Sequence, residues 1–176
     1  MTELEKLKWV AKRLKIPEDD YLLGGSASMV LHGIDRQLGD VDVFTTTKQW
    51  FSLMHGFVFS THPGTWHGFR HFQHDLILPD NENHRRFDPP ILRYNMGDLN
   101  LKVDVFHSWK VRDHKTTTDL VHIWDNHRVI VNGLPTTSLG WLRAWKQAAG
   151  REKDLEDIKL IDEYLDNTEE VTYYGP

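Results

Sequence analysis

Two segments decide the fold of this chain: Tyr21-Leu22-Leu23-Gly24-Gly25-Ser26 and, after thirteen further residues, Asp40-Val41-Asp42-Val43-Phe44. An apolar run that enters a Gly-Gly-Ser turn is typical of a strand followed by a helix, and we expect Ser26 to cap that helix. Side chains of a strand alternate between its two faces, so Asp40 and Asp42 share one face while the valines between them point into a core. The sequence therefore predicts two carboxylates that project together from one strand of a mixed α/β structure.

These two motifs have a chemical interpretation and a plain one. Like charges as close as Asp40 and Asp42 repel each other unless a cation lies between them, and Mg²⁺ prefers such hard oxygen ligands. Backbone N–H groups at a helix start favour an anion, so the Gly-Gly-Ser turn is a candidate cradle for a triphosphate. In the plain interpretation, the glycines form an ordinary turn and the Asp-x-Asp pair lies on an exposed one.

A third carboxylate follows much later, in the alternating segment 99–106. Its odd-numbered residues are apolar, which leaves Lys102, Asp104 and Phe106 on the opposite face. If that face lies beside strand 41–44, Asp104 meets Asp40 and Asp42, and the carboxylate oxygens converge to within about 4–7 Å, as a two-metal site requires. The alternative is a half-exposed strand on which Lys102 neighbours Asp104.

The rest of the chain alternates helices and strands. Helical spacing and capping residues predict helices at 2–16, 26–33, 47–54, 138–150 and 152–165, the last with Leu155, Ile158, Ile161 and Leu165 inward. Further strands are expected at 57–60, 69–74, 91–94 and 129–131, with a β-hairpin joining 91–94 to 99–106 and a long loop at 79–90. We expect one domain over 1–176, with an α/β core at 1–134 and C-terminal helices with an acidic tail at 135–176.

Composition excludes several classes of protein. The chain has no cysteine, which excludes disulfides, thiolate zinc sites and cysteine nucleophiles and agrees with a reducing cytoplasm. It has no apolar run of membrane-spanning length, and a charged N-terminus stands where a signal peptide would be apolar. Residues 151–176 hold nine acidic and three basic residues, so 1–150 is nearly neutral, with 18 basic and 17 acidic residues. Neither a membrane nor extended DNA is therefore an expected partner.

In combination, the strand, the Gly-Gly-Ser turn, the helix, the Asp-Val-Asp motif and the later Asp104 resemble the nucleotidyltransferase superfamily whose fold polymerase β shares. The resemblance is to its small bacterial and phage branch, which includes antibiotic nucleotidyltransferases and the toxins of type IV abortive-infection systems. It extends from about Leu22 to about Leu165, because segment 142–158 looks like the helix pair that closes the fold in these proteins. The resemblance implies an α+β fold with a mixed twisted sheet flanked by helices.

The resemblance also implies an activity and roles for residues. The implied reaction moves a nucleoside monophosphate from an NTP to an acceptor hydroxyl or phosphate and releases pyrophosphate. Asp40 and Asp42 would hold two Mg²⁺ ions, and Asp104 would complete the site at the metal that activates the acceptor. Gly25 and Ser26 would hold the phosphates. The same resemblance assigns Lys146 to the phosphates and includes Arg36, which stands four residues before Asp40 where this branch often carries Arg, although Leu38 replaces the usual Thr or Ser.

Several alternatives stay open. The acceptor is a small molecule, a tRNA end or a protein side chain, with His84-Arg85-Arg86 as a basic segment that would favour the last two. A catalytically inert nucleotide- or partner-binding module of the same fold is the rival class. Zinc at His67, His71 and His74 is disfavoured, because a strand turns His74 to the opposite face; His107 is the histidine expected nearest the site. Trp141 and Trp145, four residues apart, are expected to pack together.

Overall fold

A computed structural model describes residues 1–60, 73–77, 91–106 and 120–168. The helices are α1 (Glu3–Leu14), α2 (Gly25–Leu31), α3 (Thr47–Ser60), α4 (Leu120–His127), α5 (Leu139–Ala149) and α6 (Glu152–Asn167), with short 3₁₀ turns η1 (Glu18–Asp20) and η2 (Gly97–Leu99). The strands are β1 (Tyr21–Gly24), β2 (Asp40–Thr45), β3 (Gln73–Ile77), β4 (Ile91–Met96), β5 (Leu101–Phe106), β6 (Arg128–Val131) and β7 (Leu134–Thr137).

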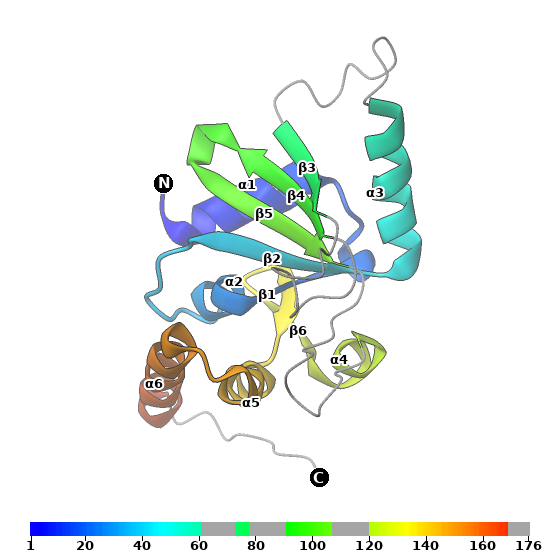
Figure 1. The fold of residues 1–176 in the computed structure, drawn as a ribbon. Coiled ribbons are helices and arrows are strands. Elements are labelled where there is room, and N and C mark those ends of the chain that lie inside the picture. Colours follow the sequence, from blue (N-terminus) through cyan, green and yellow to red (C-terminus); the bar gives the residue numbers. More distant parts are fainter. Residues whose placement is uncertain (61–72, 78–90, 107–119, 169–176) are drawn as a thin grey trace.

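These strands form one mixed sheet in the order β3-β4-β5-β2-β1-β7-β6 (Figure 1). The pairs β2–β5 and β1–β7 are parallel, and the other neighbouring strands are antiparallel. The parallel pairing of β2 with β5 is the feature that positions the site, because it joins two strands that lie about sixty residues apart in the sequence. The predicted α+β architecture of a mixed sheet flanked by helices is confirmed.

The two faces of the central strands differ in chemistry. Val41 and Val43 of β2 and Val103 of β5 are fully buried in a core that includes Leu7 and Val10 of α1. On the opposite face, the rings of Phe44 and Phe106 stack with their centroids 5.6 Å apart and join a second apolar cluster under α4 and α5. The alternation in 40–44 and 101–106 thus separates an apolar face from a face that carries the aspartates.

Several element ends follow from local signals. Thr2 and Glu5 form a reciprocal capping box at the start of α1. Ser138 caps α5, and Gly150, with a left-handed φ of 61°, ends it. Asn132 and Gly133 both have positive φ in the tight turn between β6 and β7. The predicted turn and the predicted start and end of the 138–150 helix are confirmed.

Other predictions were wrong. Residues 57–60 are the last turn of α3 and not a strand, because the apolar positions Trp50, Leu53, Met54 and Phe57 keep helical spacing across Gly56. Ser26 does not cap α2: the helix begins one residue earlier, at Gly25, after an extended Gly24. Of the strand predicted at 69–74, residues 73 and 74 do lie in a strand, β3, and the rest of that prediction falls outside the described residues.

The helix predicted at 152–165 forms, but its buried face is rotated. Leu155 is 54% exposed, whereas Asp154, Asp157 and Ile161 are buried. Lys146 and Arg151 contact the two buried aspartates and compensate their charges, and hydrophobic periodicity does not predict such contacts. Two elements, α4 and β7, were not predicted at all. No described helix has the length and apolar character needed to cross a membrane.

Candidate active site

The Gly-Gly turn lies directly against the first pair of carboxylates. Gly24 is paired with Asp42 across β1 and β2. Gly25, the first residue of α2, has a left-handed φ of 58°, and a Cβ placed on it would lie 2.4 Å from Oδ2 of Asp42. Only glycine fits this conformation and this approach without strain. The N–H groups of the first turn of α2, which includes Ser26, have no acceptor within the helix, so the turn presents donors beside a carboxylate.

The third aspartate lies on the neighbouring strand at the same level. In the parallel register of β2 and β5, Asp42 is the partner of Asp104, and Asp40 is the partner of Lys102. Neighbouring strands are about 4.8 Å apart, and aligned residues share a face. The predicted approach of the strand bearing Asp104 to the strand bearing Asp40 and Asp42 is therefore present. The expected convergence of the carboxylate oxygens stays a prediction.

The charges of this face act on Asp42. Burial, and after it the negative charges of Asp40 and Asp104, raise the pKa of Asp42 to about 7. Lys153 and Lys146 act in the opposite direction. A carboxyl group at this pKa is half-ionised near neutral pH, and a cation beside it would favour the ionised form. The donor set at Asp40 and Asp42 therefore fits a hard divalent cation.

Asp104 has a partner of its own. Arg93 stands opposite it in the antiparallel register of β4 and β5. Nε of Arg93 donates to Oδ1 of Asp104 at 2.6 Å, and Nη2 donates to Oδ2, also at 2.6 Å. Within the described part of the chain, no group of three His, Asp or Glu side chains stands in the arrangement of a metal site. The Arg93 contact engages both oxygens of the carboxylate that would complete one.

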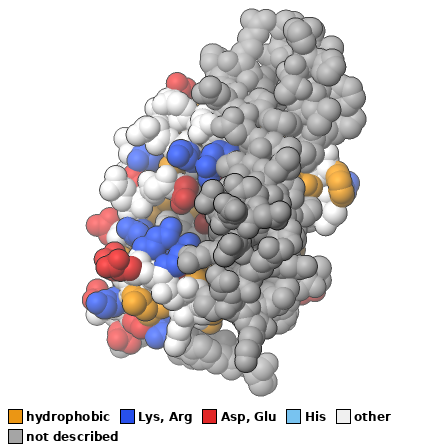
Figure 2. Space-filling model, viewed as in Figure 1, with side chains coloured by type: hydrophobic (Ala, Val, Ile, Leu, Met, Phe, Trp, Pro, Cys, Tyr) orange, Lys and Arg blue, Asp and Glu red, His pale blue; other side chains and the backbone are white. Residues whose placement is uncertain are grey.

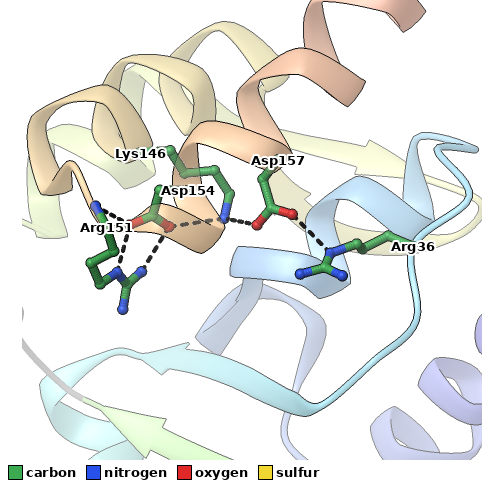
Figure 3. A network of polar contacts seen from close by, with 5 residues as sticks. All are labelled: Arg36, Lys146, Arg151, Asp154 and Asp157. Carbon is green, nitrogen blue, oxygen red and sulfur yellow. Dashed lines mark hydrogen bonds and ion pairs between the residues drawn. The ribbon is translucent and has the colours of Figure 1, made fainter.

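A buried ionic network connects the C-terminal helices to the loop before β2 (Figure 3). Nζ of Lys146 donates to Asp157 at 2.6 Å and to Asp154 at 3.5 Å. Arg36 forms an ion pair with the other oxygen of Asp157 at 2.8 Å, and Arg151 donates two hydrogen bonds to Asp154 from its side chain. Lys146, Asp154 and Asp157 are all at most 3% exposed. We call these five residues the ionic network.

The ionic network also acts on the carboxylate face. Burial alone would lower the pKa of Arg151, but the hydrogen-bonded ion pair with Asp154 and, to a smaller extent, the charges of Asp42 and Asp40 raise it. Lys146 and Lys153 favour the ionised form of Asp42. The start of α6 therefore supplies positive charge toward the aspartates. On the face seen in Figure 2, Lys and Arg side chains likewise gather among acidic ones.

The predicted site residues thus fall into two groups. Gly25, Ser26 and the three aspartates lie around one turn and two paired strands. Lys146 and Arg36, which the sequence assigned to the nucleotide, are bound to the buried aspartates of α6.

The sequence analysis did not assign Arg93, Arg151 or Lys153 to the site, although all three are charged residues near this face. Arg151 and Lys153 stand in segment 142–158, which the sequence analysis singled out, but Arg93 carries no local signal, because only the register of β4 against β5 places it on Asp104.

Trp141 and Trp145 pack together as expected, with ring centroids 6.5 Å apart. Of the other predictions, those on His67, His71, segment 84–86 and His107 lie outside the described residues.

Comparisons with known proteins identify the fold. No protein-family model and no curated protein sequence matches the chain. Two solved structures share its fold over nearly the whole length. A Thermotoga maritima protein assigned as a nucleotidyltransferase is 18% identical, with a TM-score of 0.58 over 94% of this chain and 96% of that one. The lincosamide antibiotic adenylyltransferase LnuA, with lincomycin bound, is 12% identical, with a TM-score of 0.55 over 93% and 98%.

The chain has the nucleotidyltransferase fold. At these identities the similarity establishes the architecture, and the chemistry has to be argued from the residues themselves. Within this fold, the Gly-Gly turn follows β1, and the three carboxylates come from β2 and β5.

Proposed function

We propose that this protein is a metal-dependent nucleotidyltransferase that moves a nucleoside monophosphate from an NTP to an acceptor hydroxyl or phosphate and releases pyrophosphate. One observation carries the proposal: Asp42 lies between a glycine that approaches its carboxylate and an aspartate at the same level of a parallel strand. This combination joins donors for a triphosphate to ligands for a cation. The shared fold with LnuA, an adenylyltransferase, supports it.

The triphosphate side of the site is formed by the start of α2. The N–H groups of Gly25 and Ser26, with the Ser26 hydroxyl, donate to the β- and γ-phosphates. Lys146 and Arg36 act from within the ionic network, which fixes their positions and adds positive charge behind the aspartates. Arg151 and Lys153 extend this positive charge toward the same face.

The carboxylates hold the cation and the acceptor proton. Two Mg²⁺ ions held by Asp40, Asp42 and Asp104 would stabilise the attacking and the leaving oxygen together. Asp104 takes the proton of the acceptor hydroxyl as the acceptor oxygen bonds to the α-phosphorus. The bond from that phosphorus to the leaving pyrophosphate breaks in the same displacement. The Gly25 turn holds the triphosphate so that the departing group stays aligned.

The proposal is tested by incubating the purified protein with each α-labelled NTP, Mg²⁺ and a cell extract, and asking which species takes up label. We expect Asp42→Asn to lower transfer by about 100-fold or more, because several kcal/mol of charge stabilisation are lost. Asp35→Asn, which removes an exposed carboxylate from the preceding loop, is the matched control and keeps wild-type transfer. Wild-type turnover in the Asp42→Asn protein would refute the assignment.

The acceptor is part of the same proposal. LnuA was solved with lincomycin bound, so this fold accommodates a small-molecule ligand. We infer a small-molecule acceptor for this chain, and label recovered in tRNA or in protein would assign the macromolecular alternative instead.

The ion pair between Arg93 and Asp104 favours a second candidate, a module that binds a metal–nucleotide complex without transferring it. Nucleotide binding without label transfer to any extract component identifies that case.

A further inference from the structure

Of the three aspartates, Asp104 is the one that forms an ion pair within the described part of the chain. It is 5% exposed, and the guanidinium of Arg93 contacts both of its oxygens in a bidentate pair across β4 and β5. A buried carboxylate without a compensating charge is strongly destabilising, so a protein without metal needs a partner for this residue. Arg93 supplies that partner.

A divalent ion and Arg93 compete for Asp104. An ionised carboxylate has about four lone-pair directions, and a bidentate guanidinium takes one on each oxygen. Two positive groups on one carboxylate repel each other at short range in a poorly solvated site. The Arg93 side chain is 29% exposed, so one side of it reaches water, whereas the Asp104 side chain is only 7% exposed. The arginine is therefore the partner that can move outward.

We propose that Arg93 is a positioning residue that stands in for a cation on Asp104 in the metal-free protein and yields one or both of its oxygens when a divalent ion binds beside Asp42. This inference rests on the proposed function, because it assumes that the three carboxylates serve a metal. It makes the affinity of the site for a divalent ion depend on a residue that does not itself bind the ion. Arg93 thereby lowers the affinity of the site for a free divalent ion.

The test is the affinity of the purified protein for Mn²⁺ alone, measured by titration calorimetry and by the loss of the free-ion signal in electron paramagnetic resonance. In Arg93→Gln, Asp104 loses its counter-charge and is available to the ion. We expect Mn²⁺ to bind at least about tenfold more tightly than in the wild type. The melting temperature without metal falls, and Mn²⁺ raises it by more than it raises that of the wild type. Unchanged or weaker Mn²⁺ binding by a folded Arg93→Gln protein would overturn the inference.

Three further comparisons separate this role from a merely structural one. Arg93→Lys keeps the charge and is expected to bind Mn²⁺ with nearly wild-type affinity. Adding Arg93→Gln to Asp104→Asn should leave Mn²⁺ affinity as it is in Asp104→Asn, since the competition no longer exists. Arg143→Gln breaks another bidentate pair, to Asp162 between α5 and α6, and should leave Mn²⁺ affinity at the wild-type value. A gain in Arg143→Gln equal to that in Arg93→Gln would refute a specific role for Arg93.

The outcome also distinguishes this inference from the proposed function. A wild-type protein that binds no Mn²⁺ and transfers no label refutes both. A wild-type protein that binds Mn²⁺ and transfers label, with no change in Mn²⁺ affinity in Arg93→Gln, refutes only the role of Arg93.

Discussion

Gly25 combines two demands at a single residue. Its left-handed backbone disfavours a side chain, and any Cβ would meet the carboxylate of Asp42. Gly133 makes only the first demand: its φ is 78°, and nothing lies within 4 Å of the place where its Cβ would be. The two glycines therefore separate the cost of the backbone conformation from the cost of the close approach.

We expect Gly25→Ala and Gly133→Ala each to lower the free energy of unfolding by roughly 1–2 kcal/mol through the left-handed conformation. Only Gly25→Ala should also weaken Mn²⁺ and NTP binding, because its methyl group displaces Asp42. Chemical denaturation and ligand titration measure the two effects. Equal ligand affinities in both variants would reduce the Gly-Gly-Ser turn to a plain connection.

Asp42 makes the metal-free protein sensitive to pH. Its pKa is about 7 in the folded protein and near the ordinary 3.8 in the unfolded chain. Between these values the folded state binds more protons than the unfolded one, so the free energy of unfolding falls as pH rises from about 4 to about 7. Denaturation at a series of pH values without metal should show this fall. Saturating Mg²⁺ should reduce the fall, and Asp42→Asn should abolish it. A flat profile for the wild type between these pH values would contradict it.

At the scale of elements, the ionic network binds α5, α6 and the loop before β2 together. Asp157 accepts from Lys146 and pairs with Arg36, so its removal leaves two cations facing a buried neutral group. The pair of Arg143 with Asp162 joins the same two helices at positions 35% and 40% exposed. Buried and exposed ion pairs can thus be compared between the same helices.

We expect Asp157→Asn to lower the free energy of unfolding by about 3–5 kcal/mol, the usual cost of breaking a buried pair from one side. Asp162→Asn should cost less than about 1 kcal/mol, because water solvates its exposed partners. Urea denaturation of both variants measures the difference. Similar values for the two would mean that the buried network contributes no more than a surface contact.

At the scale of the whole molecule, the site exists only in the folded sheet. Asp42 and Asp104 come from strands far apart in the sequence, and their parallel pairing needs the crossover between β2 and β5 to be complete. A cation that these residues share binds the folded state and not the unfolded one. Binding must therefore stabilise the fold by mass action.

Mn²⁺ should accordingly raise the melting temperature in a concentration-dependent way, equivalent to about 2.7 kcal/mol at one hundred times its dissociation constant. Differential scanning fluorimetry measures the shift. Asp35→Asn should shift as the wild type does, and Asp42→Asn should not shift. A shift of wild-type size in Asp42→Asn would place the ion elsewhere on the protein.

Local rules account for much of the fold. Alternation assigned the aspartates and valines of 40–43 to opposite faces, and the capping signals at Thr2 and Ser138 and the glycine at 150 marked helix ends, because these features depend on neighbours a few residues away. The same locality explains the errors. The apolar pattern of segment 57–60 fits either a helix or a strand, and the segment is helical because it continues the preceding turn of α3.

By itself, the sequence determined which residue types share a strand face, and from three aspartates and a Gly-Gly-Ser turn it predicted a metal and phosphate site. Only the tertiary structure decided which strands are neighbours, and hence that Asp104 is level with Asp42 and is held by Arg93. It also turned Asp154 inward and Leu155 outward on α6. The physical reason is that burial of a charge depends on partners brought together by long-range pairing, and hydrophobic periodicity along one segment carries no information about those partners.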